Sequence, residues 1–237
     1  MNFQKGEIIP IDKPYRMSSF GALAHIRYVL SRKLGHKVKI GHAGTLDPLA
    51  TGVLILCTGK KTKEIEQLQA HTKEYEATLQ LGATTASYDM EHTVNHTYPT
   101  RHVTKELVEQ ALTQFVGEIQ QVPPTYSAVK VNGDRAYALR RAGEEVTLKP
   151  KTVRIDDIQL THYDDANKQI SIRVVCGKGT YIRSLARDLG RALGTGAFLT
   201  SLRRTRVGDY AAADCVSFDH FKEWLDNQDI EDNNSNN

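Results

Sequence analysis

The chain has 237 residues, enough for one large domain or two small ones with an ample core. Its hydrophobic fraction of 40% and charged fraction of 25% are typical of globular proteins, and no apolar run approaches the roughly 20 residues of a membrane span. The N-terminus lacks the apolar segment of a signal peptide. The three cysteines lie far apart, so they predict neither a disulfide framework nor a metal motif, and we expect a cytoplasmic protein.

The net charge of +3 is distributed unevenly. Residues 225–237 contain four acidic residues and no Lys or Arg, which leaves +7 on the rest of the chain. A basic body suits a polyanionic partner, although many unrelated domains are equally basic.

The first part of the chain predicts a strand, a helix and a second strand. The short strand covers residues 7–11. Ser18 or Ser19 can cap a helix whose apolar residues recur at helical spacing, and Gly35 is a natural stop. Residues 53–56, Val-Leu-Ile-Leu, predict a buried strand.

The middle of the chain alternates between clear patterns and polar stretches. Residues 62–70 predict a short helix, and residues 73–82 alternate as a half-buried strand does. The polar, histidine-rich residues 83–103 predict a loop. Thr104 caps a further predicted helix that ends near Gly117.

Residues 120–154 predict an excursion from the core. Within them we expect a strand at 127–131, a tight turn at Asn132-Gly133 and a short helix at 134–142. The stretch is rich in basic residues, namely Lys130, Arg135, Arg140, Arg141, Lys149, Lys151 and Arg154. This stretch is either a solvated charged surface or an insertion that binds a polyanion.

The remaining elements follow in order. Residues 153–160 and 169–176 flank a turn and predict an antiparallel pair. A helix is expected after the glycine-rich residues 177–180, and a last amphipathic helix at 218–225. From residue 227 the chain is rich in Asn and Asp, and we expect disorder there.

Thirteen residues, Gly41 to Val53, stand out as a possible site. Their sequence GHAGTLDPLATGV holds three glycines and a proline, so it cannot be one regular helix or strand. Pro48 restricts the backbone of Asp47, and the buried strand that follows anchors the turn. One carboxylate is thus held on a stiff turn. The simplest alternative is an ordinary loop in which Asp47 caps a turn.

This string resembles the catalytic signature of the TruB family of tRNA pseudouridine synthases, which isomerise a uridine in the T loop of tRNA. The similarity runs from about Asp12 to about Asp219. A second match is CGKGTYIR, residues 176–183. The resemblance implies that Asp47 is the catalytic aspartate, that Arg183 pairs with it, and that Tyr181 packs near the target uracil.

The resemblance assigns further residues to substrate binding. Tyr75, in a Lys-x-Tyr strand, is expected to stack on the flipped base, and without the resemblance it would be a core aromatic. Leu202 would line the same pocket. His42 would help to hold the everted nucleotide, and Lys63 would lie near the substrate backbone. Arg203, Arg204 and Arg206 would bind phosphates.

Other patterns are weaker. The run GKGT, residues 177–180, lacks the spacing of a nucleotide-binding loop. His92, His96 and His102 have no fourth ligand in pattern, so a polar surface loop is the simpler interpretation. The resemblance implies no metal and no cofactor.

Three features depart from the family pattern. Ala86 replaces an acid in the loop Thr85-Ala86-Ser87-Tyr88-Asp89, which puts a role for that loop in doubt, and Arg16 stands where the family usually has glycine. We also expect no small C-terminal RNA-binding domain of the PUA type, which the family usually has beyond this point.

The sequence therefore predicts a mixed α/β (α+β) fold with a central, mainly antiparallel sheet and flanking helices. We expect a catalytic domain at residues 1–226 and an acidic tail at 227–237. The predicted function is isomerisation of uridine 55 in the T arm of tRNA by a monomeric enzyme. Two alternatives stay open: a guide-RNA-dependent synthase of the same superfamily, and an RNA-binding or tRNA-folding protein without turnover.

Overall fold

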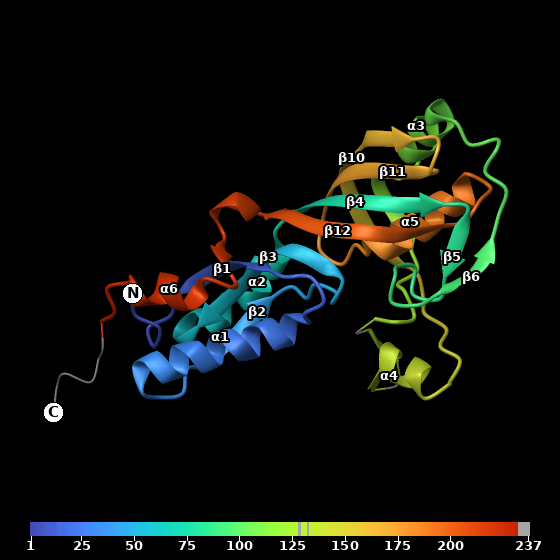
Figure 1. Cartoon of the computed structure of the whole chain (residues 1–237). Helices are drawn as coiled ribbons and strands as arrows, with labels where there is room; N and C mark the ends of the chain where they lie inside the picture. Colours follow the sequence, from blue (N-terminus) through green and yellow to red (C-terminus); the bar gives the residue numbers. More distant parts are fainter. Residues whose placement is uncertain (128, 132, 232–237) are drawn as a thin grey trace. The chain divides into compact units, whose positions relative to one another are not determined.

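The structure is a computed structural model that describes residues 1–127, 129–131 and 133–231. The chain divides into two compact units (Figure 1). The first unit comprises residues 1–73 together with the chain from residue 203 onward, and the second comprises residues 74–202. Strand β12 (Ala197–Val207) begins in the second unit and ends in the first, so it belongs to the strand order of both.

The strands of the first unit follow the order β14-β1-β3-β12. Their bounds are Val216–Ser217 for β14, Ile8–Lys13 for β1 and Ala50–Thr58 for β3, with β2 (Ile40–Ala43) also paired to β3 and β13 (Tyr210–Ala211) to β12. β1 and β3 are antiparallel, with Ile11 opposite Leu54. The predicted buried strand is confirmed, since residues 53–58 of β3 are all buried.

Helix α1 (Ser19–Leu34) has the limits that the sequence predicts. The side chain of Ser18 accepts a hydrogen bond from the N–H of Gly21, and Gly35 ends the helix at a φ of 71°. One face of α1 packs against β1 and β3, through a core that includes Ile26, Leu30 and Leu54. The other helices are the 3₁₀ turns η1 (Gly59–Glu64) and η2 (Ala212–Asp214), α2 (Ile65–Ala70) and α6 (Phe221–Asp226).

The strands of the second unit follow the order β12-β4-β11-β10-β7. Their bounds are Lys73–Leu81 for β4, Gln169–Cys176 for β11, Lys151–Asp164 for β10 and Gly117–Gln121 for β7. The predicted antiparallel pair is confirmed by β10 and β11, and alternate residues of β4 are buried. Helices α3 (Lys105–Thr113) and α5 (Ile182–Ala192) flank this sheet (Figure 1). The fold is thus mixed α/β with mainly antiparallel strands, as the sequence predicts.

Two segments differ from the prediction or lie partly outside the described residues. The loop predicted at residues 83–103 is wrong in part, because β5 (Ala83–Thr85) and β6 (Val94–Thr97) form an antiparallel pair there. All four residues of β6 are exposed, so no alternation of apolar residues marked it. The excursion contains β8 (Lys130–Val131), β9 (Asp134–Arg135) and α4 (Ala136–Arg141), while Asn132 of the predicted turn lies outside the described residues.

The end of the chain is described as far as residue 231. Ile230 packs against the core of the first unit, and the N–H of Glu231 donates to the carbonyl of Met1 at 2.9 Å. Residues 232–237 of the predicted tail lie outside the described residues. Among the described helices, none is both long and apolar enough to span a membrane.

Gly52 should tolerate a side chain poorly, because it lies close to the backbone of a neighbouring strand. It has a φ of 101°, and an added Cβ would lie 2.1 Å from the carbonyl oxygen of Arg204. Gly35 is a matched control, because its φ is 71° but no atom lies within 4 Å of the added Cβ. Gly35→Ala should cost about 1–2 kcal/mol of unfolding free energy. Gly52→Ala should cost clearly more in urea denaturation, and equal losses would contradict this packing.

Candidate active site

Asp47 lies in the loop between β2 and β3, residues 44–49, which we call the Asp47 loop. Its carbonyl accepts a hydrogen bond from the N–H of Ala50 at 3.1 Å, which closes a turn with Pro48 at the second position. Leu46 is buried, and both its N–H and its carbonyl bond to the hydroxyl of Ser19, at 2.8 and 2.9 Å. The half-buried Asp47 is therefore fixed on both sides.

Arg204 connects the start of this loop to strand β3, which follows it. Its side chain is only 2% exposed, and it donates to the carbonyl of Gly44 at 3.0 Å and to that of Val53 at 2.8 Å. Backbone carbonyls thus satisfy a buried guanidinium. The prediction that Arg204 binds phosphates is wrong, because the side chain is inside the protein.

The side chain of Arg203 makes a different contact from that of Arg204. Its guanidinium makes a bidentate pair with Asp12, at 3.0 and 2.7 Å, so its predicted phosphate contact is also replaced by an internal one. Arg206 is exposed on the same strand, and its predicted phosphate contact stays a prediction.

Lys13 is a second buried cation beside the Asp47 loop. Its ammonium donates to the carbonyls of Pro14 at 2.8 Å, Met17 at 2.6 Å and Pro48 at 3.4 Å. The side chain is fully buried. Burial lowers the pKa of Lys13 to about 8, against the opposing effect of Asp47, while Arg204 lowers it further. A lysine that the sequence does not single out thus supports the residue that follows Asp47.

His42 lies on β2, just before the loop, and is half-buried. Burial first, and then the charge of Arg204, lower the pKa of His42, so the ring is neutral at pH 7. Within the described part of the chain, its Nδ1 is buried without a hydrogen-bond partner. A neutral imidazole can contact a nucleotide without adding charge to the site.

Lys63 is exposed on η1 and lines a hollow of about 380 Å³. Three other lysines line the same hollow, namely Lys37, Lys39 and Lys60. Four ammonium groups around one depression favour an anionic ligand such as a phosphate backbone. This setting suits the role that the resemblance gives to Lys63.

Arg183 lies in the first turn of α5, in the second unit. Its side chain is 4% exposed and donates to the carbonyls of Ser87 at 3.3 Å and Tyr126 at 3.0 Å. Its Nε lies 3.8 Å from a carboxylate oxygen of Asp89. Asp89 is 5% exposed and accepts from the hydroxyl of Ser87 at 2.5 Å and the N–H of Glu91 at 3.0 Å.

Asp89 is therefore a candidate site residue that sequence reasoning missed. The substitution at Ala86 put the whole loop in doubt, yet the last acid of the loop pattern is present and contacts Arg183. That retained acid was the signal in the sequence. The loop thus contacts Arg183 despite Ala86.

The other predicted site residues of the second unit lie on or next to α5, β4 and β12. Tyr181 immediately precedes α5, and the side chain of Gln121 accepts from its N–H at 2.8 Å and donates to its carbonyl at 3.2 Å. Tyr75 is 8% exposed on β4. Leu202 is half-buried on β12, which neighbours β4 in the sheet.

The predicted site residues divide between the units. Asp47, His42 and Lys63 belong to the first, and Tyr75, Tyr181, Arg183 and Leu202 to the second. The pairing of Arg183 with Asp47 stays a prediction. Among the described residues, no group of three or more His, Cys, Asp or Glu could hold a metal ion.

The lowered pKa of Lys13 predicts a change of stability with pH. Because the unfolded chain binds this proton more tightly than the folded chain, stability should rise as pH increases from about 8 to 10.5. The gain should reach about 3 kcal/mol at most. Urea unfolding of the wild type and of Lys13→Met at several pH values isolates the effect, because other groups titrate in both proteins. A stability difference that does not change with pH would contradict it.

Two family models match the chain. One describes the N-terminal domain of TruB family pseudouridylate synthases and matches residues 31–182. The other describes the C-terminal domain of tRNA pseudouridylate synthase B and matches residues 183–234.

Individual relatives agree with these matches. The chain is 60% identical to the tRNA pseudouridine synthase B of Bacteroides thetaiotaomicron over 100% of both chains, and 60% identical to that of Phocaeicola vulgatus over 98% of both. A solved structure of a Cbf5-Nop10-Gar1 complex matches with a TM-score of 0.69 and 29% identity. The match covers 94% of this chain and 56% of that one, so the chain spans about half of its length. By these matches, the chain belongs to the TruB family of pseudouridine synthases.

Proposed function

We propose that the chain converts uridine 55 in the T loop of tRNA into pseudouridine, and that Asp47 acts on the target nucleoside. The supporting observation is the Asp47 loop, whose backbone on both sides of Asp47 is held by Ser19, Lys13 and Arg204. The reaction breaks the bond from N1 to C1′, turns the uracil and joins C5 to C1′. C5 loses its proton to water and N1 takes up a proton, so uridine and pseudouridine are isomers. No electrons are gained or lost, and the proposal needs neither a cofactor nor a metal.

The target base must leave its stack to reach Asp47. Flipping costs a few kcal/mol, and stacking on an aromatic ring returns about 1–3 kcal/mol per base. In this proposal Tyr75 supplies the ring, while Tyr181 and Leu202 line the pocket. His42, neutral at pH 7, holds the everted nucleotide.

Arg183 is proposed to pair with Asp47 in the working enzyme. A guanidinium that bonds to the carbonyls of Ser87 and Tyr126 is held in one orientation. The carboxylate of Asp89 balances part of its charge. Arg183 can then position the catalytic carboxylate rather than merely neutralise it.

The T arm of tRNA is the proposed binding partner. Its phosphates would contact Lys63 and the three other lysines of the hollow, as well as exposed cations of the excursion such as Lys149. We propose that the enzyme works as a monomer in the cytoplasm.

The guide-RNA-dependent alternative is less well supported. The relatives at 60% identity carry the name tRNA pseudouridine synthase B, whereas the Cbf5 complex is 29% identical and contains two further proteins. The other alternative, an RNA-binding protein without turnover, gives no reason for the buried Arg183–Asp89 pair.

Replacing Asp47 by Asn tests the proposal. Asn keeps the shape but removes the charge, so tritium release from tRNA labelled at uracil C5 should fall below detection. That loss exceeds the roughly 10²–10⁴-fold usual for one proton-transfer group. Binding of tRNA should stay near the wild-type value. The control is Asp209→Asn, which removes an exposed acid of the first unit and should leave turnover unchanged.

Turnover by Asp47→Asn within about tenfold of the wild type would reject the catalytic role, since a single positioned group usually contributes more. A wild-type protein that binds tRNA but makes no pseudouridine would favour the non-catalytic alternative.

Replacing Arg183 by Lys tests the proposed role of this arginine in positioning Asp47. Lys keeps the charge but cannot donate to Ser87 and Tyr126 in one plane, so kcat should fall about 10²-fold or more. Arg173→Lys is the matched control, because Arg173 pairs with Glu74 and Asp157 on the sheet surface. That variant should retain turnover. If both variants were equally active, the planar guanidinium of Arg183 would have no special role in turnover.

A further inference from the structure

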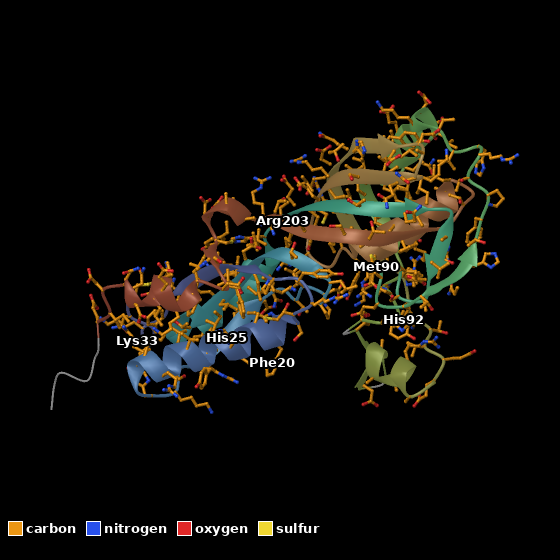
Figure 2. The ribbon with its side chains drawn as sticks, viewed as in Figure 1. Phe20, His25, Lys33, Met90, His92 and Arg203 are labelled. Carbon is orange, nitrogen blue, oxygen red and sulfur yellow. The ribbon has the colours of Figure 1, made fainter. Side chains whose placement is uncertain are left out.

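Exposed aromatic and basic side chains lie on α1 and on the turn that precedes it. They are Tyr15, Arg16, Phe20, Tyr28 and Arg32, which we call the α1 stripe. Phe20 is 66% exposed, Tyr28 60% and Tyr15 46%. Residues 20, 24, 28 and 32 recur every four positions, so they share one helix face. Figure 2 shows Phe20 on this helix.

His25 lies on another part of the same helix. Its ring packs against Phe218 at 5.0 Å, whereas the large rings of the stripe face outward. Exposed rings of this size on one face indicate a surface that binds something.

The segment that carries the stripe has charged side chains of a single sign. The thirty-four residues from Lys13 to Leu46 include seven Lys or Arg and no Asp or Glu. Lys33 is paired with Asp226 and Lys13 is buried, but Arg16 and Arg32 are exposed. Such a surface complements a polyanion better than a protein of mixed charge.

Two of the cations lie against two of the rings. The guanidinium of Arg16 is 5.5 Å from the ring centre of Tyr15, and that of Arg32 is 5.8 Å from that of Tyr28. Arg32 also donates to the hydroxyl of Tyr28 at 3.2 Å. Aromatic rings interleaved with arginines are the arrangement that binds unpaired bases and their phosphates.

The stripe is continuous with the candidate site within the first unit. Ser19, directly before Phe20, bonds to Leu46, which precedes Asp47. Lys13 joins the carbonyls of Met17 and Pro48. A nucleic acid that reaches Asp47 therefore has the start of α1 beside it.

Arg16 has an unusual backbone. Its φ of 61° is left-handed, a conformation that glycine adopts without strain. Glycine would satisfy this turn without strain, so the turn itself does not explain the exposed arginine side chain.

We propose that the α1 stripe is a second RNA-binding surface, on which unpaired bases of the substrate tRNA stack on Phe20 and Tyr28. Arg16 and Arg32 neutralise the adjoining phosphates. The inference rests on the proposed function for the identity of the RNA, but it concerns binding and not the chemistry at Asp47.

The test measures tRNA dissociation constants by filter binding at several salt concentrations, with turnover at saturating tRNA as a second readout. The double variant Phe20→Ala/Tyr28→Ala should weaken binding by about tenfold or more, as expected for lost stacking. Its turnover at saturation should stay near the wild-type value. The control is Val94→Ala/Val116→Ala, which removes two exposed apolar side chains elsewhere.

Single substitutions at Phe20 separate stacking from simple apolar contact. Phe20→Trp should bind as the wild type does, whereas Phe20→Leu should bind more weakly. Wild-type binding by Phe20→Leu would overturn the stacking role without any question of misfolding.

Arg16→Gly tests whether the charge of Arg16 contributes to tRNA binding. It should weaken binding and reduce the slope of log K against log salt by about one phosphate contact, while thermal stability stays equal or rises. Lys168→Gly is the matched control, because Lys168 is also a non-glycine residue with a left-handed φ, 51°. That variant should leave the salt slope unchanged.

The proposal is overturned if the double variant and Arg16→Gly bind tRNA as the wild type does; the stripe would then be a contact surface for a protein. A failure of the proposed function looks different, because the wild type would then bind tRNA and make no pseudouridine.

Discussion

The hydrogen bonds from Arg204 to the carbonyls of Gly44 and Val53 are the contacts on which the site depends. A buried guanidinium is costly unless its donors are satisfied, and here carbonyls at the start of the Asp47 loop and in β3 satisfy them. The loop can therefore not relax without leaving the charge unpaired. Lys13 adds a second buried cation from β1, and Ser19 fixes Leu46 from α1. Three elements of the first unit thus hold the backbone of the loop that carries Asp47.

The sequence predicted the elements with strong local signals. Helix α1 begins at the capping Ser18 and ends at Gly35, because both residues satisfy the helix ends directly. Strand β4 and the pair β10–β11 followed from alternation, since one face of each is buried. The resemblance in residues 41–53 and 176–183 supplied the proposed roles of Asp47 and Arg183, which periodicity alone would not have given.

The contacts that support the site could not be predicted, because they join residues far apart in sequence. Arg204 and Gly44 are separated by 160 positions, and nothing local distinguishes the buried Arg204 from the exposed Arg206. The same reason explains why Lys13 was missed, since it contacts Pro48 from 35 positions away, whereas Asp89 was missed because Ala86 put its loop in doubt. Strand β6 was missed because all of its residues are exposed, and such a strand resembles a polar loop.

The account joins a fixed carboxylate, a positioned arginine and a basic surface into one enzyme acting on tRNA. The most direct measurement is a position-by-position map of pseudouridine in unmodified tRNA transcripts incubated with the purified protein alone. The account predicts new pseudouridine at position 55 of the T loop, without any cofactor, guide RNA or second protein. Pseudouridine that appeared only at other positions, or only after a guide RNA and partner proteins were added, would contradict it.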